Sequence, residues 1–190
     1  MSKATPSRIH HARRAQAGVR PTLARVRDAL FNSLAAEITG AQFLDLFAGT
    51  GTLGIEALRR GAAAVVFVEQ DAKLVREIRR RLTVAGLAAR AEVWRQDVLA
   101  TIRELGRVGR QFRVIVMDPP YGEDWIGPTL RAIVDARLLA PGGVVVAEGH
   151  WRDRPATVTG FALRREARYG ETALWFFEAT GAEETGPSAY

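Results

Sequence analysis

Two short segments of this 190-residue sequence combine residue types that could bind a nucleotide and act on a base. The first segment, DLFAGTGTLG at 45–54, places Gly49, Gly51 and Gly54 in the spacing G-x-G-x-x-G. Glycines allow a tight turn and a close backbone approach to a ligand, and a helix that begins there offers free N–H groups. Glu69 follows 18 residues after Gly51, where its carboxylate could accept hydrogen bonds from ribose hydroxyls. The segment predicts a nucleoside-cofactor site, and the absence of any Gly-Lys pair excludes a P-loop.

The second segment, Asp118-Pro119-Pro120-Tyr121, ends an apolar run at 113–118. In an open α/β sheet, ligands bind beyond the carboxyl ends of the strands, where this segment would lie. The amine of adenine, cytosine or guanine has its lone pair delocalised into the ring, so methylating it requires a geometry closer to tetrahedral. Asp118 and the Pro119 carbonyl could each accept a hydrogen bond from the amine and aim its lone pair, while Tyr121 stacks on the base. With Pro120 stiffening the loop, these four residues predict catalysis at a base amine.

Composition removes several competing chemistries. The sequence contains no cysteine, which excludes a disulfide framework, a thiolate zinc site, an Fe–S cluster and a cysteine nucleophile. Methylation at pyrimidine C5 generally needs that nucleophile, and radical methylation needs the cluster, so both are excluded. No group of His, Asp and Glu has metal-ligand spacing, so we predict no metal site.

Hydropathy and charge indicate where the chain acts and what it binds. No run of about 18 apolar residues occurs, and the N-terminal segment lacks the apolar stretch of a signal peptide, so we expect a cytoplasmic monomer without membrane contact. The net charge is +6, and seven basic residues precede the first acid, Asp28. Residues 1–19 therefore form a basic arm that either contacts nucleic-acid phosphates or is a solvated tail. The candidate substrate-binding residues are Arg8, Arg13, Arg14, Arg20 and Arg25.

The elements that must hold these segments alternate between strand and helix. Short apolar runs typical of buried strands lie at 42–47, 64–69, 91–96, 113–118 and 144–148, and helical patterns lie at 23–37, 52–60, 73–85, 98–105 and 127–136. Thr22 is a candidate cap for the first helix, and the arginine run at 76–81 indicates a solvent-facing side.

The last part of the chain departs from this alternation. Two strand-like runs at 161–169 and 172–178 are joined by Gly170-Glu171 without a helix, which predicts an antiparallel hairpin. The fold class is therefore α/β, with a mostly parallel, doubly wound, seven-stranded sheet, helices on both faces and a C-terminal antiparallel hairpin. We divide the chain into a basic arm at 1–19, a catalytic domain at 20–178 and a disordered tail at 179–190.

Together these motifs resemble those of class I S-adenosylmethionine-dependent amino-methyltransferases, which have a Rossmann-like fold. More narrowly, the sequence resembles the bacterial RsmD family, which methylates guanine N2 of 16S ribosomal RNA in the small subunit. The segments that carry this narrower resemblance are RPT at 20–22, RVR at 25–27, ALFN at 29–32, LGIEAL at 53–58 and YGET at 169–172. The similarity extends from Arg20 to Glu178.

The resemblance implies S-adenosylmethionine as cofactor and a target base at Asp118 to Tyr121. The implied cofactor-binding residues are Asp45, Phe47, Gly49, Gly51, Glu69, Asp97 and Val98. Asp97 matches the position that contacts the adenine of the cofactor, although it could instead cap the helix that begins at Val98.

Three alternatives remain open. Family members usually begin with a glycine- and arginine-rich hairpin, which the arm at 1–19 lacks, and Asp-Pro-Pro-Tyr also serves adenine N6 and cytosine N4. A DNA adenine-N6 methyltransferase is therefore an alternative. An NAD-dependent oxidoreductase would account for the glycine segment but not for Asp118–Tyr121 or the arm. A non-catalytic nucleic-acid-binding module would account for the arm but not for the two paired loops. His150 and Trp151 either line the substrate mouth or are an ordinary loop pair.

Overall fold

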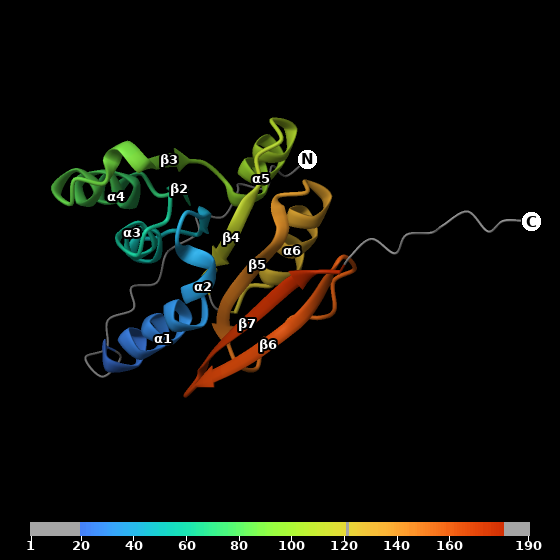
Figure 1. Cartoon of the computed structure of the whole chain (residues 1–190). Helices are drawn as coiled ribbons and strands as arrows, with labels where there is room; N and C mark the ends of the chain where they lie inside the picture. The colour runs from blue at the N-terminus through green and yellow to red at the C-terminus, as the bar shows by residue number, and fades with distance from the viewer. Residues whose placement is uncertain (1–19, 121, 181–190) are drawn as a thin grey trace, which may run out of the picture.

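The computed structural model describes residues 20–120 and 122–180, in which a seven-stranded sheet lies between two groups of helices (Figure 1). The strands are β1 (Gln42–Leu46), β2 (Ala64–Glu69), β3 (Ala91–Arg95), β4 (Phe112–Met117), β5 (Leu139–His150), β6 (Phe161–Tyr169) and β7 (Thr172–Ala179). The helices are α1 (Arg20–Ser33), α2 (Ala35–Ile38), α3 (Thr52–Arg59), α4 (Ala72–Val84), α5 (Val98–Arg107), α6 (Ile126–Asp135) and the 3-10 turn η1 (Ala88–Arg90).

The sheet has the strand order β3-β2-β1-β4-β5-β7-β6. Strands β1 to β5 all run parallel to one another. Strand β7 runs antiparallel to both of its neighbours, β5 and β6. The predicted parallel sheet with a C-terminal hairpin is confirmed. The strand order reverses between β1 and β4, and a doubly wound sheet binds ligands beyond its carboxyl ends at such a switch point.

Each face of the sheet has its own hydrophobic core. On one face, α1 to α4 bury Phe31, Leu58 and Ile78 against sheet residues such as Phe43 and Phe67. On the other face, the buried residues include Ile102 of α5, Leu130 of α6 and Trp175 of β7. Burial of one such side chain contributes about 1.5–3 kcal/mol. Burial on both faces explains why the parallel strands are nearly continuous apolar runs in the sequence.

The first helix differs from its prediction. Helix α1 begins at Arg20, so Thr22 lies inside its first turn and is not the residue that precedes it. Pro21 fits this position because the first turn of a helix has no acceptor for its missing N–H group. A break at Leu34 then separates α1 from α2.

The end of the sheet is longer than predicted. Strand β5 begins at Leu139, five residues before the expected start, and its register with β4 shifts between Phe112 and Val114. Strand β7 continues to Ala179, and the Thr180 N–H donates to the Gly160 carbonyl (3.1 Å). The first two residues of the predicted tail therefore belong to the fold, while residues 181–190 lie outside the described part of the chain.

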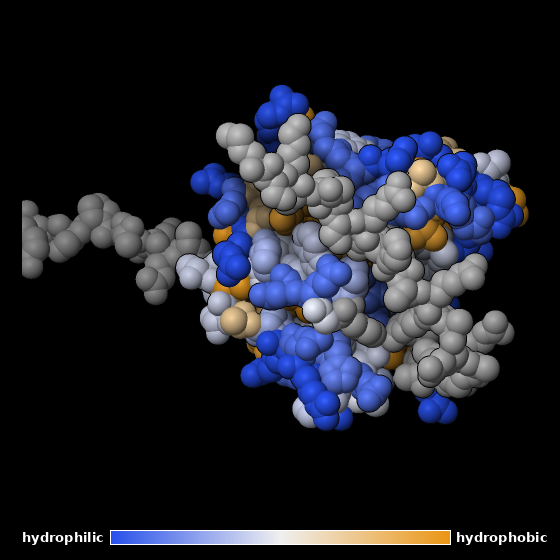
Figure 2. Space-filling model, turned by 180° about the vertical axis from the view of Figure 1, so that it is seen from behind, coloured by the Kyte–Doolittle hydropathy of each residue, from blue (hydrophilic) through white to orange (hydrophobic). Residues whose placement is uncertain are grey.

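One face of the described surface is predominantly hydrophilic. The face seen from behind shows hydrophilic residues with hydrophobic ones scattered among them (Figure 2). The large exposed hydrophobic residues in the described part are Val84, Val108 and Leu163, which lie on different elements. No helix among the described residues has the length and hydrophobicity of a membrane span.

The tight contact of α3 with β2 gives a stability prediction at Gly54. A Cβ atom at this position would overlap the Phe67 ring and lie 2.9 Å from Val65 Cγ1. Gly54→Ala should therefore reduce the free energy of unfolding by about 1–3 kcal/mol, measured by urea denaturation. The control is Gly127→Ala in the first turn of α6, where the nearest atoms to a new Cβ are 3.8 Å away, and it should be neutral or slightly stabilising. Equal midpoints for the two variants would show that α3 does not need glycine here.

Candidate active site

The loop after β1 turns sharply through three residues with left-handed backbone. Phe47 has φ 61°, Gly49 has φ 57° and Gly51 has φ 75°. The left-handed conformation is uncommon for a residue other than glycine, and such strain concentrates at functional sites. A Cβ on Gly51 would also lie 3.0 Å from Ile78 Cγ1 of α4. The loop thus requires glycine for both its backbone conformation and its close approach to α4.

Two buried carboxylates hold this loop in place. Glu69 at the end of β2 accepts from the Gly49 N–H at Oε2 (2.8 Å) and from the Asp71 N–H at Oε1 (2.9 Å). Asp45 of β1 accepts from the Gly54 N–H at Oδ2 (2.9 Å), in the first turn of α3. These bonds satisfy backbone donors that the turn and the helix start leave without partners. The same acids that were predicted to bind the cofactor therefore also shape its loop.

Sheet register brings three carboxylates together. Asp45 lies beside Phe67 of β2 and Val116 of β4. Glu69 and Asp118 each come two residues later on those neighbouring strands, and side chains two residues apart point to the same face. All three acids therefore project from adjacent strand ends on the face covered by α1 to α4.

The electrostatics of Asp45 reflect this arrangement. The pKa of the Asp45 carboxyl is raised from 3.8 to about 7, and burial is the largest cause. The hydrogen bond from Gly54 opposes this shift, while the charges of Asp118 and then Glu69 contribute to it. A cationic ligand bound at these strand ends would relieve the repulsion.

A direct contact joins the loop after β1 to the loop after β4. The ring of Phe47 meets the ring of Trp125 edge to face, with centroids 5.7 Å apart. Trp125 immediately precedes α6, and its Nε1 donates to Glu123 Oε2 (2.6 Å). The two loops predicted to hold cofactor and target therefore lie on the same rim of the sheet. Along the second loop, Asp118 is exposed and Pro119 is buried.

The remaining predicted residues are distributed as follows. Asp97 caps α5 by accepting from the Ala100 N–H (2.9 Å), which confirms the capping interpretation and leaves its contact with a cofactor as a prediction. Val98 is buried in the first turn of α5 and packs in the core, and Arg25 is exposed on α1. Pro120 is half-buried. Five predicted site residues lie outside the part of the chain whose side chains the structure describes: Arg8, Arg13, Arg14, Arg20 and Tyr121.

One residue at the loop was assigned wrongly from the sequence. Arg81 was placed on a solvent-facing side of its helix, yet its Nη1 donates to the Thr50 carbonyl (2.7 Å) and to Thr52 Oγ1 (3.2 Å). It thus anchors the glycine loop from α4. Its spacing of three residues from the buried Ile78 was the signal that it shares the inward side of the helix. Trp125 carried no comparable signal, because its partner lies in another loop.

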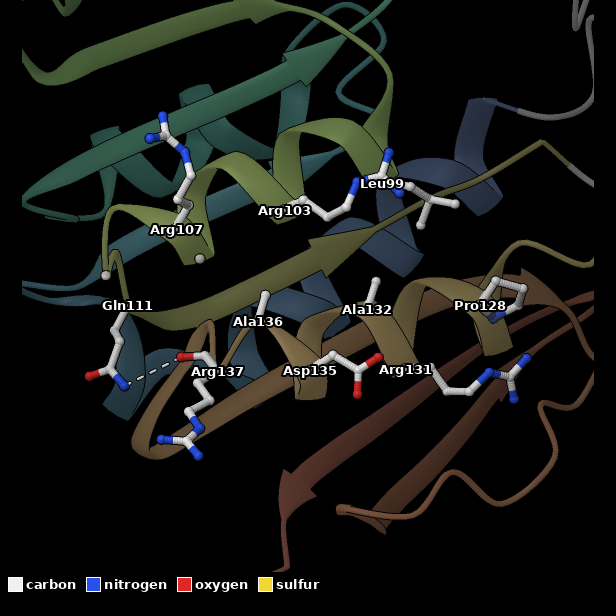
Figure 3. A pocket seen from close by; sticks show the side chains of 12 residues that line it. Leu99, Arg103, Arg107, Gln111, Pro128, Arg131, Ala132, Asp135, Ala136 and Arg137 are labelled. Atoms are coloured by element: carbon white, nitrogen blue, oxygen red, sulfur yellow. Dashed lines mark hydrogen bonds between the residues drawn. The ribbon is translucent and has the colours of Figure 1, made fainter.

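A cavity of about 840 Å³ lies elsewhere, between α5 and α6. Arg103 and Arg131 extend toward the same end of this cavity, whereas Arg107 and Arg137 point outward at the other end (Figure 3). Its lining includes none of the three clustered acids, so it is separate from the candidate site. In the described part of the chain, no group of three or more His, Cys, Asp or Glu residues could hold a metal ion.

Comparison with known proteins agrees with this geometry. Residues 11–178 match the model of a family described as conserved hypothetical protein 95. The chain is 31% identical over 169 residues to ribosomal RNA small subunit methyltransferase D of Escherichia coli, covering 88% of this chain and 83% of that protein. It is 35% identical over 164 residues to a Bacillus subtilis protein named "Putative rRNA methyltransferase YlbH", covering 85% of this chain and 89% of that one.

A solved structure shares the fold. The structure named "Putative methyltransferase yhhF from Escherichia coli" superposes with a TM-score of 0.76 at 28% sequence identity. The match covers 83% of this chain and 88% of that one. The predicted Rossmann-like methyltransferase fold is therefore confirmed.

The raised pKa of Asp45 predicts how stability depends on pH. Between about pH 4 and pH 7 the folded protein holds a proton on Asp45 that the unfolded chain has lost. The free energy of unfolding should therefore fall as pH rises through this window, by up to about 4 kcal/mol, and this contribution should not change further above pH 7. Asp45→Asn removes the titrating group while keeping an oxygen that can accept from Gly54.

Urea denaturation of both proteins at several pH values measures this effect. The stability of the wild type relative to Asp45→Asn should decrease between pH 4 and pH 7. Parallel stability profiles for the two proteins would contradict the assignment of a raised pKa to Asp45.

Proposed function

The chain belongs to the family described as conserved hypothetical protein 95, and from that membership we propose that it methylates guanine N2 of 16S ribosomal RNA in the small subunit. The methyl donor is S-adenosylmethionine, as in methyltransferases that share this fold. One observation carries the proposal: the glycine loop after β1 and the Asp118 loop after β4 contact each other through Phe47 and Trp125. A donor held by one loop would lie beside an amine held by the other.

The residues at the ends of β1 and β2 fit this cofactor. Glu69 is buried, and each of its oxygens keeps a second lone pair for a ribose hydroxyl. The negative charge around Asp45 suits a positively charged sulfur. The proposed cofactor-binding residues are Asp45, Phe47, Gly49, Gly51, Glu69, Asp97 and Val98.

The second loop supplies the groups that act on the base. When bound, the cofactor supplies an electrophilic methyl group on a positively charged sulfur. The Asp118 carboxylate and the Pro119 carbonyl each accept an amine hydrogen bond, which withdraws the nitrogen lone pair from the ring and directs it toward the methyl. After transfer the nitrogen carries an extra proton, and Asp118 can pass it to water because it is exposed. Pro120 and Tyr121 complete the proposed target site.

Positive charge near this rim would bind the RNA backbone. The N-terminal end of α1 lies on the side to which β4 and β5 point (Figure 1). Arg20 and Arg25 belong to this helix, and the arm with Arg8, Arg13 and Arg14 precedes it. We assign phosphate contacts to these arginines. We further propose that the chain works in the cytoplasm. We also propose that it is a monomer, because the large exposed hydrophobic residues of its described part are scattered.

Removal of the Asp118 carboxylate tests the mechanism. Asp118→Ala should lower methyl transfer to small ribosomal subunits that lack the modification by about 10²–10³-fold, because it removes an acceptor that is needed in the transition state. The dissociation constant for S-adenosylmethionine should change much less than methyl transfer, because Asp45 and Glu69 remain at the cofactor side when the Asp118 charge is removed. Labelled-methyl transfer with nucleoside mass spectrometry measures the first quantity, and calorimetry measures the second.

The matched control is Asp124→Ala, which removes another exposed acid from the same loop and should keep full activity. Undiminished transfer by Asp118→Ala would contradict its catalytic role. Transfer to adenine in duplex DNA, with none to ribosomal particles, would instead support the DNA alternative.

A further inference from the structure

Four side chains form a compact group where β5 ends. The guanidinium carbon of Arg168 lies 4.0 Å from the centroid of the Trp151 ring, and that of Arg152 lies 5.0 Å from it. The His150 ring stacks near Trp151 with centroids 6.0 Å apart. We call these four residues the Trp151 cluster. It combines two planar cations with two aromatic rings.

The turn between β6 and β7 fixes this cluster. The backbone N–H of Trp151 donates to the Glu171 carbonyl (3.0 Å), and Arg168 Nε donates to the Gly170 carbonyl (2.8 Å). This turn is part of the YGET segment at 169–172, which the proposed function has not used. Backbone acceptors on one turn thus hold the Trp151 backbone and the Arg168 guanidinium that packs against the indole.

The cluster lies at the same end of the sheet as the target loop. Strands β4 and β5 are parallel, with Met117 beside Ala147, so Asp118 follows one strand where its neighbour continues to His150. His150 pairs in turn with Thr172 at the start of β7. The turn between β6 and β7 accordingly lies on the side to which β4 and β5 point (Figure 1). His150 and Trp151 thus lie at and just after the end of β5, the strand next to β4, whereas Arg168 lies on β6, three strands from β4.

The positive charges of the cluster are available to a ligand. Arg152 and Arg168 are both exposed, and neither forms an ion pair with another residue in 20–120 or 122–180. By contrast, two other arginines nearby in the sequence form ion pairs: Arg154 with Glu166 (3.0 Å) and Arg164 with Glu37 (3.3 Å). The two cluster arginines therefore keep their charge unneutralised next to a ring.

We propose that the Trp151 cluster binds an unpaired nucleotide of the substrate RNA next to the target base. The base would stack on the Arg168 guanidinium, which is planar and already packed on Trp151, and Arg152 would bind the adjoining phosphate. Proteins recognise unpaired RNA in this way, by stacking splayed bases on aromatic rings or guanidinium planes. This inference rests on the proposed function for the choice of RNA as substrate.

Arg168→Ala, compared with a matched variant on the same strand, tests this proposal. Arg165 also packs on an aromatic ring, with its guanidinium carbon 5.6 Å from the Phe176 centroid, but it donates to Ser33 on the face that carries α1. Arg165→Ala therefore removes the same charge and a similar contact from the opposite face of the hairpin. Arg168→Lys keeps the charge and loses the planar surface.

The measurements are the dissociation constants for a short single-stranded RNA and for a duplex of the same sequence, together with the KM values for small ribosomal subunits and for S-adenosylmethionine. Arg168→Ala should weaken single-stranded RNA binding about tenfold, and Arg168→Lys nearly as much. Arg165→Ala should change it by less than about threefold. Duplex binding and the KM for the cofactor should stay within the same threefold range.

Several results would overturn the proposal. If Arg168→Ala and Arg165→Ala lose the same affinity for single-stranded RNA, only surface charge matters. If Arg168→Lys binds this RNA as tightly as the wild type, the base does not stack on the guanidinium. An unchanged dissociation constant for single-stranded RNA in Arg168→Ala would show that the Trp151 cluster does not bind RNA. Thermal unfolding shows that each variant is folded. If the wild type transfers methyl groups to DNA alone, the proposed function fails, while the RNA binding comparison still tests the cluster independently.

Discussion

The structure depends on the burial of Asp45 between two other acids. A buried carboxylate costs free energy unless it is hydrogen-bonded or neutralised, and here Gly54 supplies a bond while Asp118 and Glu69 add repulsion. This unfavourable burial occurs at the point where the strand order of the sheet reverses. A positively charged ligand at the strand ends would offset it, so the unfavourable charge distribution of the protein alone becomes favourable in a complex.

The surrounding fold holds these acids by packing that leaves little freedom. Gly54 lets α3 approach β2, and Arg81 anchors the glycine loop from α4. Phe47 then meets Trp125 across the switch point. Chemistry between two bound molecules requires their reacting atoms to be held close together, and a contact between rigidly supported loops meets this requirement. The cavity between α5 and α6 lies apart from this arrangement.

Hydrophobic patterns in the sequence predicted the features that depend on neighbouring residues in the chain, such as the bounds of a buried strand. The apolar run at 64–69 matches β2 to the residue, because a strand buried on both faces cannot contain polar side chains except at its end. Glu69, at that end, was recognised as a site residue from its spacing of 18 residues after Gly51. Contacts between distant segments were not predictable in this way. Arg81 is 31 residues from the Thr50 carbonyl that it binds, and the indole of Trp151 meets Arg168 only because β6 folds back along β7.

We propose that one ligand spans the ends of β1 and β2 and faces the loop after β4. A crystal structure of the chain with S-adenosylhomocysteine, the product of the donor, is the decisive measurement. We expect the ribose at Glu69, the backbone of Gly49 and Gly51 against the ligand, and the sulfur on the side of Asp118. A ligand seated between α5 and α6, or one whose sulfur faces away from Asp118, would overturn this proposal.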